Sequence, residues 1–287
     1  MTTLLTPDAA TPTPPVDSPP AATPPGTGAR RRRRWARVVA PLLAAFALIV
    51  ATLVVHAIAQ PSTTDPDYLN PASDASIGAL SVARGVTSRG ITLTVVHASD
   101  DAIALARRGN ATLFVPAPDL VRPGNQIALR TLPPSVTVIA VRPSPVALDY
   151  AGYGFLGVHR RWATTPATGC VLPGLGPSTR ALVDRDRYAT APGIPADVVP
   201  AATVDCFGHA VRAWQPYGMP EFVLVSANDV FRNDRVGELD DAAVASALLT
   251  RHPTLIWLDL HRGEPQPKPQ GANAPPPPDG DQGGQRT

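Results

Sequence analysis

Two cysteines, and the polar residues beside one of them, are the side chains best suited to chemistry. Asp205 precedes Cys206, His209 follows it three residues later, and Cys170 is the second cysteine of the chain. A thiolate beside an imidazole base can act as a nucleophile, as in a hydrolase. An even number of cysteines outside the cytoplasm favours a disulfide instead. We expect the disulfide, because a short sequence spacing does not by itself position a base against a thiolate.

The sequence predicts neither a metal site nor a nucleotide cofactor. Cys206 and His209 could supply half of a zinc site, but no second Cys/His pair at ligand spacing occurs. Residues 152–157 match the pattern G-x-G-x-x-G of dinucleotide-binding loops. Such a loop follows a strand directly, whereas here about ten residues separate it from the strand expected to end at Val141. We therefore interpret the glycine pattern as coincidental.

A polar segment between an apolar run and a helix is a candidate ligand pocket. Asn228, Asn233 and Asp234 lie between the run 222–225 and a helix expected over 239–250. Ligands of open parallel sheets bind beyond the carboxyl ends of the strands, so these residues could form a pocket floor. The alternative is a loop whose side chains only bind its own backbone.

Two pairs of adjacent carboxylates stand where helices are expected to begin. They are Asp100 with Asp101, and Asp240 with Asp241. Carboxylates at such positions accept hydrogen bonds from free N–H groups and suit the helix dipole. We expect both pairs to cap helices and not to act as acid and base.

The spacing of apolar residues predicts one α/β domain over 65–262. Strands are expected at 91–96, 111–115, 136–141, 221–225 and 255–260, and helices at 73–88, 100–108, 123–129 and 239–250. This alternation predicts a Rossmann-like, mostly parallel sheet with helices on both faces. The β-branched run 91–96 predicts a strand buried on both faces. We expect loops and short strands over 150–200, and pairing of 210–214 with 221–225.

A membrane anchor is expected before this domain. The apolar stretch from Val38 to Ala59 would be about 33 Å long as a helix, enough to cross a bilayer core of about 30 Å. Arg30 to Arg34 precede it, and positive charge is retained on the cytoplasmic side. We expect an uncleaved transmembrane helix, within 35–60, that places the domain outside. Ala57 to Ala59 resemble a signal-peptidase site, so cleavage is the alternative.

The remaining composition describes two tails and a nearly neutral domain. The tails, over 1–34 and 263–287, are rich in Pro and poor in large apolar residues, which predicts disorder. Six of the 25 basic residues and two of the 23 acidic ones precede Gln60, so 19 basic and 21 acidic residues follow, a net charge of −2. A domain that binds nucleic acid would carry a basic surface, so we expect no such partner.

Several segments together resemble the actinobacterial domain of unknown function 4350 family. They lie at 70–76, 84–96, 111–115, 233–236, 242–249 and 256–257. The resemblance implies a glutamine amidotransferase-like α/β fold behind a membrane helix, with no established catalytic residues. It also implies partners among the membrane proteins of an assembly linked to a MoxR-type ATPase. The chain differs in having Asp240-Asp241 where the family tends to have Gly-Asn, and a hydrophilic tail in place of a second membrane helix.

These observations favour a single-pass membrane protein whose outward α/β domain binds a partner or acts as a scaffold. We expect contact with the lipid bilayer, no cofactor and no enzymatic reaction. The alternative is a diverged amidotransferase-like hydrolase that uses Cys206 and His209.

Overall fold

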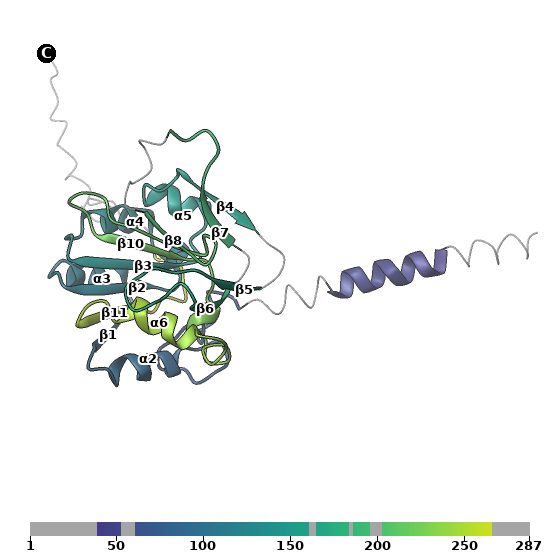
Figure 1. The fold of residues 1–287 in the computed structure, drawn as a ribbon, viewed down its shortest axis with the longest axis horizontal. Coiled ribbons are helices and arrows are strands. Elements are labelled where there is room, and N and C mark those ends of the chain that lie inside the picture. Colours follow the sequence, from purple (N-terminus) through teal and green to yellow (C-terminus); the bar gives the residue numbers. More distant parts are fainter. Residues whose placement is uncertain (1–38, 53–60, 161–164, 184–185, 196–202, 266–287) are drawn as a thin grey trace, which may run out of the picture. The chain divides into compact units, whose positions relative to one another are not determined.

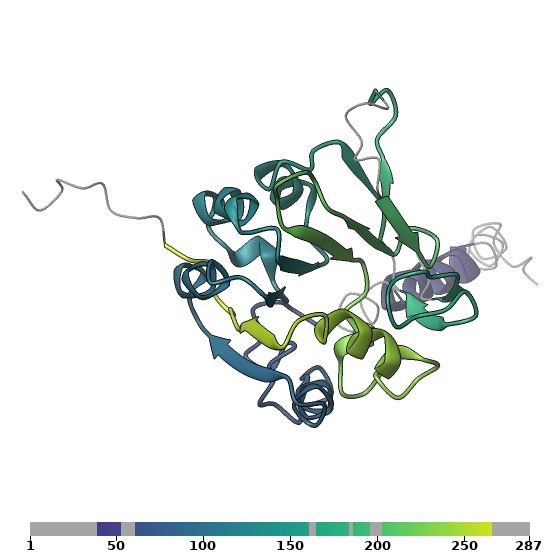
Figure 2. The ribbon, with the colours of Figure 1, turned by 60° about the vertical axis from the view of Figure 1, so that its left-hand side comes forward.

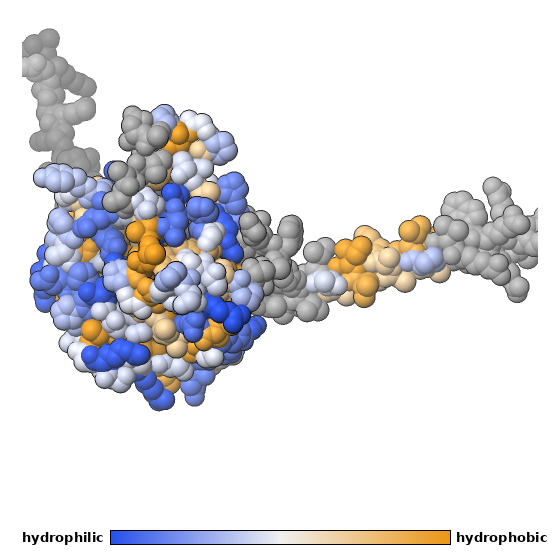
Figure 3. Space-filling view, viewed as in Figure 1, coloured by the Kyte–Doolittle hydropathy of each residue, from blue (hydrophilic) through white to orange (hydrophobic). Residues whose placement is uncertain are grey.

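The computed structural model describes residues 39–52, 61–160, 165–183, 186–195 and 203–265. The first range is a helix that belongs to a unit separate from Pro61–Thr287, and its apolar side chains are exposed (Figure 3). Within the described ranges, no helix is both long and apolar enough to cross a bilayer. The rest of the predicted span, Val38 and residues 53–59, lies outside these ranges, as do most residues of both predicted tails. The membrane anchor therefore stays a prediction.

Seven strands form the central sheet of the second unit (Figure 1). Their order is β1 (Thr92–Val96), β11 (Thr254–Leu258), β2 (Ala111–Val115), β3 (Val136–Val141), β10 (Glu221–Val225), β9 (Val211–Trp214) and β8 (Thr203–Cys206). The first five are parallel, and β9 is antiparallel to both of its neighbours. The expected mostly parallel α/β sheet is confirmed.

Helices cover both faces of this sheet (Figure 2), as expected. One face packs against α2 (Leu80–Thr87) and α6 (Asp241–Leu249) around Trp257. The other face packs against α3 (Ser99–Ala106), α4 (Pro123–Ala128) and α5 (Pro145–Tyr150). Side chains of one strand alternate between the two cores, which is why Leu113 and Phe114 belong to different clusters.

Aromatic contacts fill the thickest part of each core. On the α2/α6 face, the Phe114 ring lies 4.5 Å from Trp257 and 4.8 Å from Phe231. On the other face, Tyr153 lies 4.8 Å from Trp214. Edge-to-face and tilted pairs at these separations add to the free energy gained by burial. The two aromatic clusters hold the long loops of the domain against the sheet.

Two expectations about individual elements were wrong. β1 is the edge strand, and it is partly exposed instead of buried on both faces. Within the described residues β1 has a neighbour on one side only, because β11, the last strand, lies between β1 and β2 and not on the outer side of β1. The first helix is also shorter than expected: residues 71–79 form turns, and α2 begins at Leu80.

The segment between α5 and β8 forms two small antiparallel pairs outside the main sheet. β4 (Leu156–Arg160) pairs with β7 (Asp186–Thr190), and β5 (Thr165–Thr168) pairs with β6 (Arg180–Val183). Short one-turn 3-10 helices, among them 229–231, complete the chain. The expected loops with short strands are confirmed for the described residues of this segment.

Candidate functional site

The carboxyl ends of the five parallel strands form the edge at which ligands bind in open α/β sheets. The residues that follow these ends are His97, Asp259, Pro116, Arg142 and Ser226. Polar side chains are therefore frequent at this edge.

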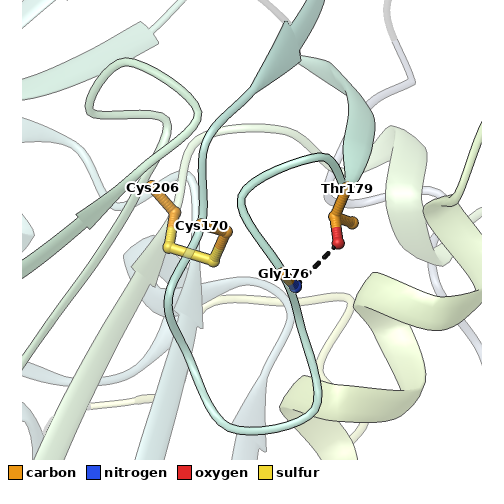
Figure 4. Close-up of a disulfide and its surroundings, with 4 residues drawn as sticks. All are labelled: Cys170, Gly176, Thr179 and Cys206. Atoms are coloured by element: carbon orange, nitrogen blue, oxygen red, sulfur yellow. Dashed lines mark hydrogen bonds between the residues drawn. A yellow bond between two sulfur atoms is a disulfide. The ribbon is translucent and has the colours of Figure 1, made fainter.

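The disulfide lies at the carboxyl edge. Cys170 and Cys206 are bonded, as expected, and both are buried (Figure 4). Val211 is in register with Val225, the last residue of β10, on one side and with Cys206 on the other. Cys206 therefore lies at the carboxyl edge. His209 Nδ1 lies 3.2 Å from Asp205 Oδ1. A nucleophilic Cys206 would require the disulfide to be reduced, so the hydrolase hypothesis lacks a thiolate in this structure.

Asn233 connects the loop after β10 to the turns before α2. Its Nδ2 donates to the carbonyl oxygens of Ser73 and Ala75, both at 2.8 Å, and its Oδ1 accepts from the Ser81 N–H at 2.9 Å. Asp234 forms an ion pair of 2.7 Å with Arg232, and 34% of its side chain is exposed. The side-chain groups of Asn233 that could hold a ligand are thus engaged with the protein itself.

Asn228 lies at the carboxyl edge beside Tyr68. Burial raises the pKa of Tyr68 to about 12, against the charge of Arg142 and the nearby Asn228 amide, which both lower it. The Tyr68 hydroxyl and Asn228 Nδ2 form no hydrogen bond of good geometry, with each other or with other described residues. Ser226 Oγ is also buried and forms no hydrogen bond with the described residues. These groups could donate hydrogen bonds to an acceptor oxygen.

Arg142 follows β3 in a turn that leads into α5. Its φ of 50° is in the left-handed region, which costs free energy for a residue other than glycine, and its N–H donates to Val225 O at 2.8 Å. Its charge also lowers the pKa of Tyr188, which burial raises well above the usual value. Arg142 is thus the cation shared by two buried phenols.

His97, Asp259 and His261 form a second polar cluster at this edge, which the sequence interpretation missed. Asp259 Oδ1 lies 2.9 Å from His261 Nε2, and His97 Nδ1 lies 3.1 Å from the Asp259 carbonyl oxygen and 3.4 Å from Oδ2. A carboxylate at Nδ1 can leave the Nε2 of His97 as a base. Part of the signal was available, since His97 and His261 directly follow the first and last predicted strands, whereas Asp259 was expected inside the last one. Among the described residues no three ligand side chains converge as a metal site.

Glu264 closes part of this edge. Its carboxylate accepts hydrogen bonds from the N–H and Oγ of Ser99 and from the Arg122 N–H at 3.2 Å. Ser99 and Arg122 begin α3 and precede α4, so one carboxylate serves two helix starts. The segment after β11 is thereby fixed across the ends of the strands.

Neither acidic pair caps its helix through a side-chain hydrogen bond, so that expectation was wrong. Asp100 binds Asn125 and Arg122, which lower its pKa. Asp240 and Asp241 accept the N–H groups of Arg180 and Leu182 and so hold strand β6. Burial raises the pKa of Asp241 to about 7. Tertiary partners compete successfully with the local cap.

A groove of about 450 Å³ lies at the opposite, amino edge of the sheet. Its walls come from the starts of β3 and β10, the end of α6 and the loop after Cys170. The lining residues with polar side chains are Thr137, Gln215, Glu221, Thr250, Arg251 and His252. This volume is within the range of small-molecule and peptide sites.

A continuous set of polar contacts crosses the floor of this groove. Arg251 Nη2 lies 2.8 Å from Glu221 Oε1, Thr137 Oγ1 donates to Glu221 Oε2 at 2.9 Å, and His252 Nε2 lies 3.1 Å from Thr137 Oγ1. Burial and then the charge of Arg251 lower the pKa of His252, so the neutral imidazole is favoured. The floor therefore offers fixed donors and acceptors. Sequence reasoning missed it because its residues come from three separate segments.

Comparisons with protein-family models, curated proteins and solved structures give no match for this chain.

Proposed function

We propose that this protein is a single-pass membrane protein whose α/β domain faces outward and binds a partner without catalysing a reaction. The observation that carries the placement is the buried Cys170–Cys206 disulfide, because such bonds persist outside the cytoplasm. The apolar helix over 39–52 and the arginines before it support the anchor and its orientation. The family resemblance, and partners from a MoxR-type ATPase-linked assembly, belong to the same proposal.

The groove at the amino edge is the binding surface of this proposal. Its charged groups, Glu221 and Arg251, neutralise each other, so it suits a polar, uncharged segment of a partner protein. The nearly neutral domain, with its net charge of −2, gives no support to a nucleic-acid partner.

Topology can be tested with one exposed cysteine in the full chain. Tyr217 is fully exposed in the turn between β9 and β10, and Tyr217→Cys should react with a membrane-impermeant maleimide in intact cells. Ala21→Cys, before the anchor, should react only after the cells are permeabilised. Labelling of Ala21→Cys but not Tyr217→Cys in intact cells would overturn the orientation.

Binding can be tested by filling the groove. Ala247→Trp should occupy it, and Val146→Trp on α5, exposed on the other face, is the matched control. We expect a membrane protein that copurifies with the full chain to be lost with Ala247→Trp and kept with Val146→Trp. Retention of the same partner by both variants would exclude the groove, and turnover of a substrate by the purified protein would exclude the non-enzymatic role.

A further inference from the structure

The outer side of strand β1 is an unpaired sheet edge. Among the described residues, β11 is the only strand bonded to β1, and it lies on one side of β1. The Thr92 N–H donates to Pro253 O at 2.9 Å, and Val96 O accepts from the Asp259 N–H at 2.8 Å. These bonds show that Thr92 and Val96 direct their backbone groups toward β11.

Alternation along the strand then determines which groups face outward. Thr94, like Thr92 and Val96, is bonded to β11, whereas Leu93 and Val95 direct their N–H and C=O groups away from the sheet. Val95 is also 39% exposed, although it is a large apolar residue in a regular strand. The edge thus offers an apolar side chain and two residues whose outward backbone groups have no partner among the described residues.

β1 carries none of the devices that normally prevent pairing at an edge. The run Thr92–Val96 contains no charged residue and no proline. Proteins usually protect such edges with Lys, Pro, a bulge or a covering segment, because an open edge is a template for another strand. Among the described residues, the helices α2 and α3 pack on the faces of the sheet, and no strand lies on the outer side of β1.

The charges that flank β1 are opposite at its two ends. Exposed Arg84 and Arg89 lie before the strand; exposed Asp101 lies after it, next to Asp100, whose carboxylate is already paired with Arg122. An antiparallel copy of β1 would bring the basic end of each copy to the acidic end of the other. A parallel copy would place like charges together and would not close into a dimer.

We propose that this edge is a self-association surface, at which β1 of two copies of this chain pair antiparallel about a two-fold axis. In this pairing the outward N–H and C=O groups of Leu93 form hydrogen bonds with those of Val95 of the second copy, so these two residues lie opposite each other. Thr94 then lies on the axis, opposite its own equivalent, in a pair without mutual hydrogen bonds. The two seven-stranded sheets become one continuous sheet. The inference does not depend on the ligand groove or on the orientation in the membrane.

The register can be tested by cross-linking the full chain in its membrane. Residues in a non-hydrogen-bonded antiparallel pair have Cα atoms about 4.5 Å apart, which a disulfide can span. Thr94→Cys should therefore give a disulfide-linked homodimer under mild oxidation, seen on a non-reducing gel. Thr92→Cys, which would lie opposite Val96 of the second copy, should give none. Equal yields from both variants, no dimer, or a cross-link to a different protein would overturn the proposal.

Blocking the edge gives an independent test. Val95→Pro removes an N–H that has no partner in the sheet, so the domain should keep its thermal transition while the Thr94→Cys dimer is lost. Val95→Lys, which adds a charge to the strand, should act in the same way and serves if the proline variant does not fold. A dimer that persists in a folded blocked variant would overturn pairing through β1.

Discussion

The two edges of the sheet differ in how their polar groups are used. At the carboxyl edge, Asn233 and Glu264 bind backbone groups of distant segments, while Tyr68, Asn228 and Ser226 hold buried polar atoms that form no hydrogen bond of good geometry with the described residues. At the amino edge, Thr137, Glu221, Arg251 and His252 line a groove and contact one another. Polar groups at the carboxyl edge connect distant segments of the domain, whereas those at the amino edge line an open groove. The usual location of ligand sites in parallel sheets is therefore a poor guide to where this domain is hollow.

This comparison predicts that substitutions at the carboxyl edge lower stability more than those at the amino edge. The largest effect should come from the disulfide. Replacing Cys170 and Cys206 with alanine opens a loop with a sequence separation of 36, and the free energy of unfolding should fall by about 4 kcal/mol. Urea unfolding of the full chain measures the change, and added reductant should destabilise the wild type but not the double variant.

Asn233→Ala should have the next largest effect. The substitution removes three hydrogen bonds to the turns before α2, at about 1 kcal/mol each, so the expected loss is about 3 kcal/mol. Asp234→Ala, which breaks an exposed ion pair, is the matched control and should cost less than about 1 kcal/mol. Equal losses of stability for the two variants would mean that the hydrogen bonds of Asn233 to the turns before α2 do not stabilise the domain.

Asp241 should make stability depend on pH. Its pKa is about 7 in the folded protein and 3.8 when unperturbed, so the folded state binds more protons between these values. Its contribution to stability is therefore complete below about pH 4 and decreases as pH rises toward 7. Asp241→Asn keeps an acceptor for the Leu182 N–H and should lessen this decrease by on the order of 2 kcal/mol, measured by unfolding at pH 5 and pH 8. An unchanged pH profile would contradict the assignment.

The smallest effects should distinguish two neighbouring buried threonines. Thr137 and Thr112 are paired in register on β3 and β2, but only the Thr137 hydroxyl has partners among the described residues. Thr137→Val should cost about 1 kcal/mol, because Glu221 loses a donor, whereas Thr112→Val should be neutral or slightly stabilising. Thermal unfolding of both variants is the measurement. A larger loss of stability for Thr137→Val than for Asn233→Ala would contradict the prediction that the carboxyl edge contributes more to stability than the amino edge.

Patterns local in the sequence were sufficient for most elements. Runs such as 111–115 and 136–141 are strands because their continuous apolar character suits burial on both faces, and the alternation with helices was enough to predict a parallel sheet. The pairing of the two cysteines also followed from their number. These properties depend on composition and short-range periodicity, which a single sequence contains.

The order of the strands and the partners of polar groups required the folded chain. The run 91–96 has the same apolar character as the buried strands, but β11 inserts beside it and leaves it at the edge. Asp240 and Asp241 stand at a helix start and yet accept N–H groups of strand β6. The groove floor likewise joins Thr137, Glu221 and His252 across long sequence distances. Sequence spacing cannot predict such contacts, since they arise only when the sheet brings separate segments together.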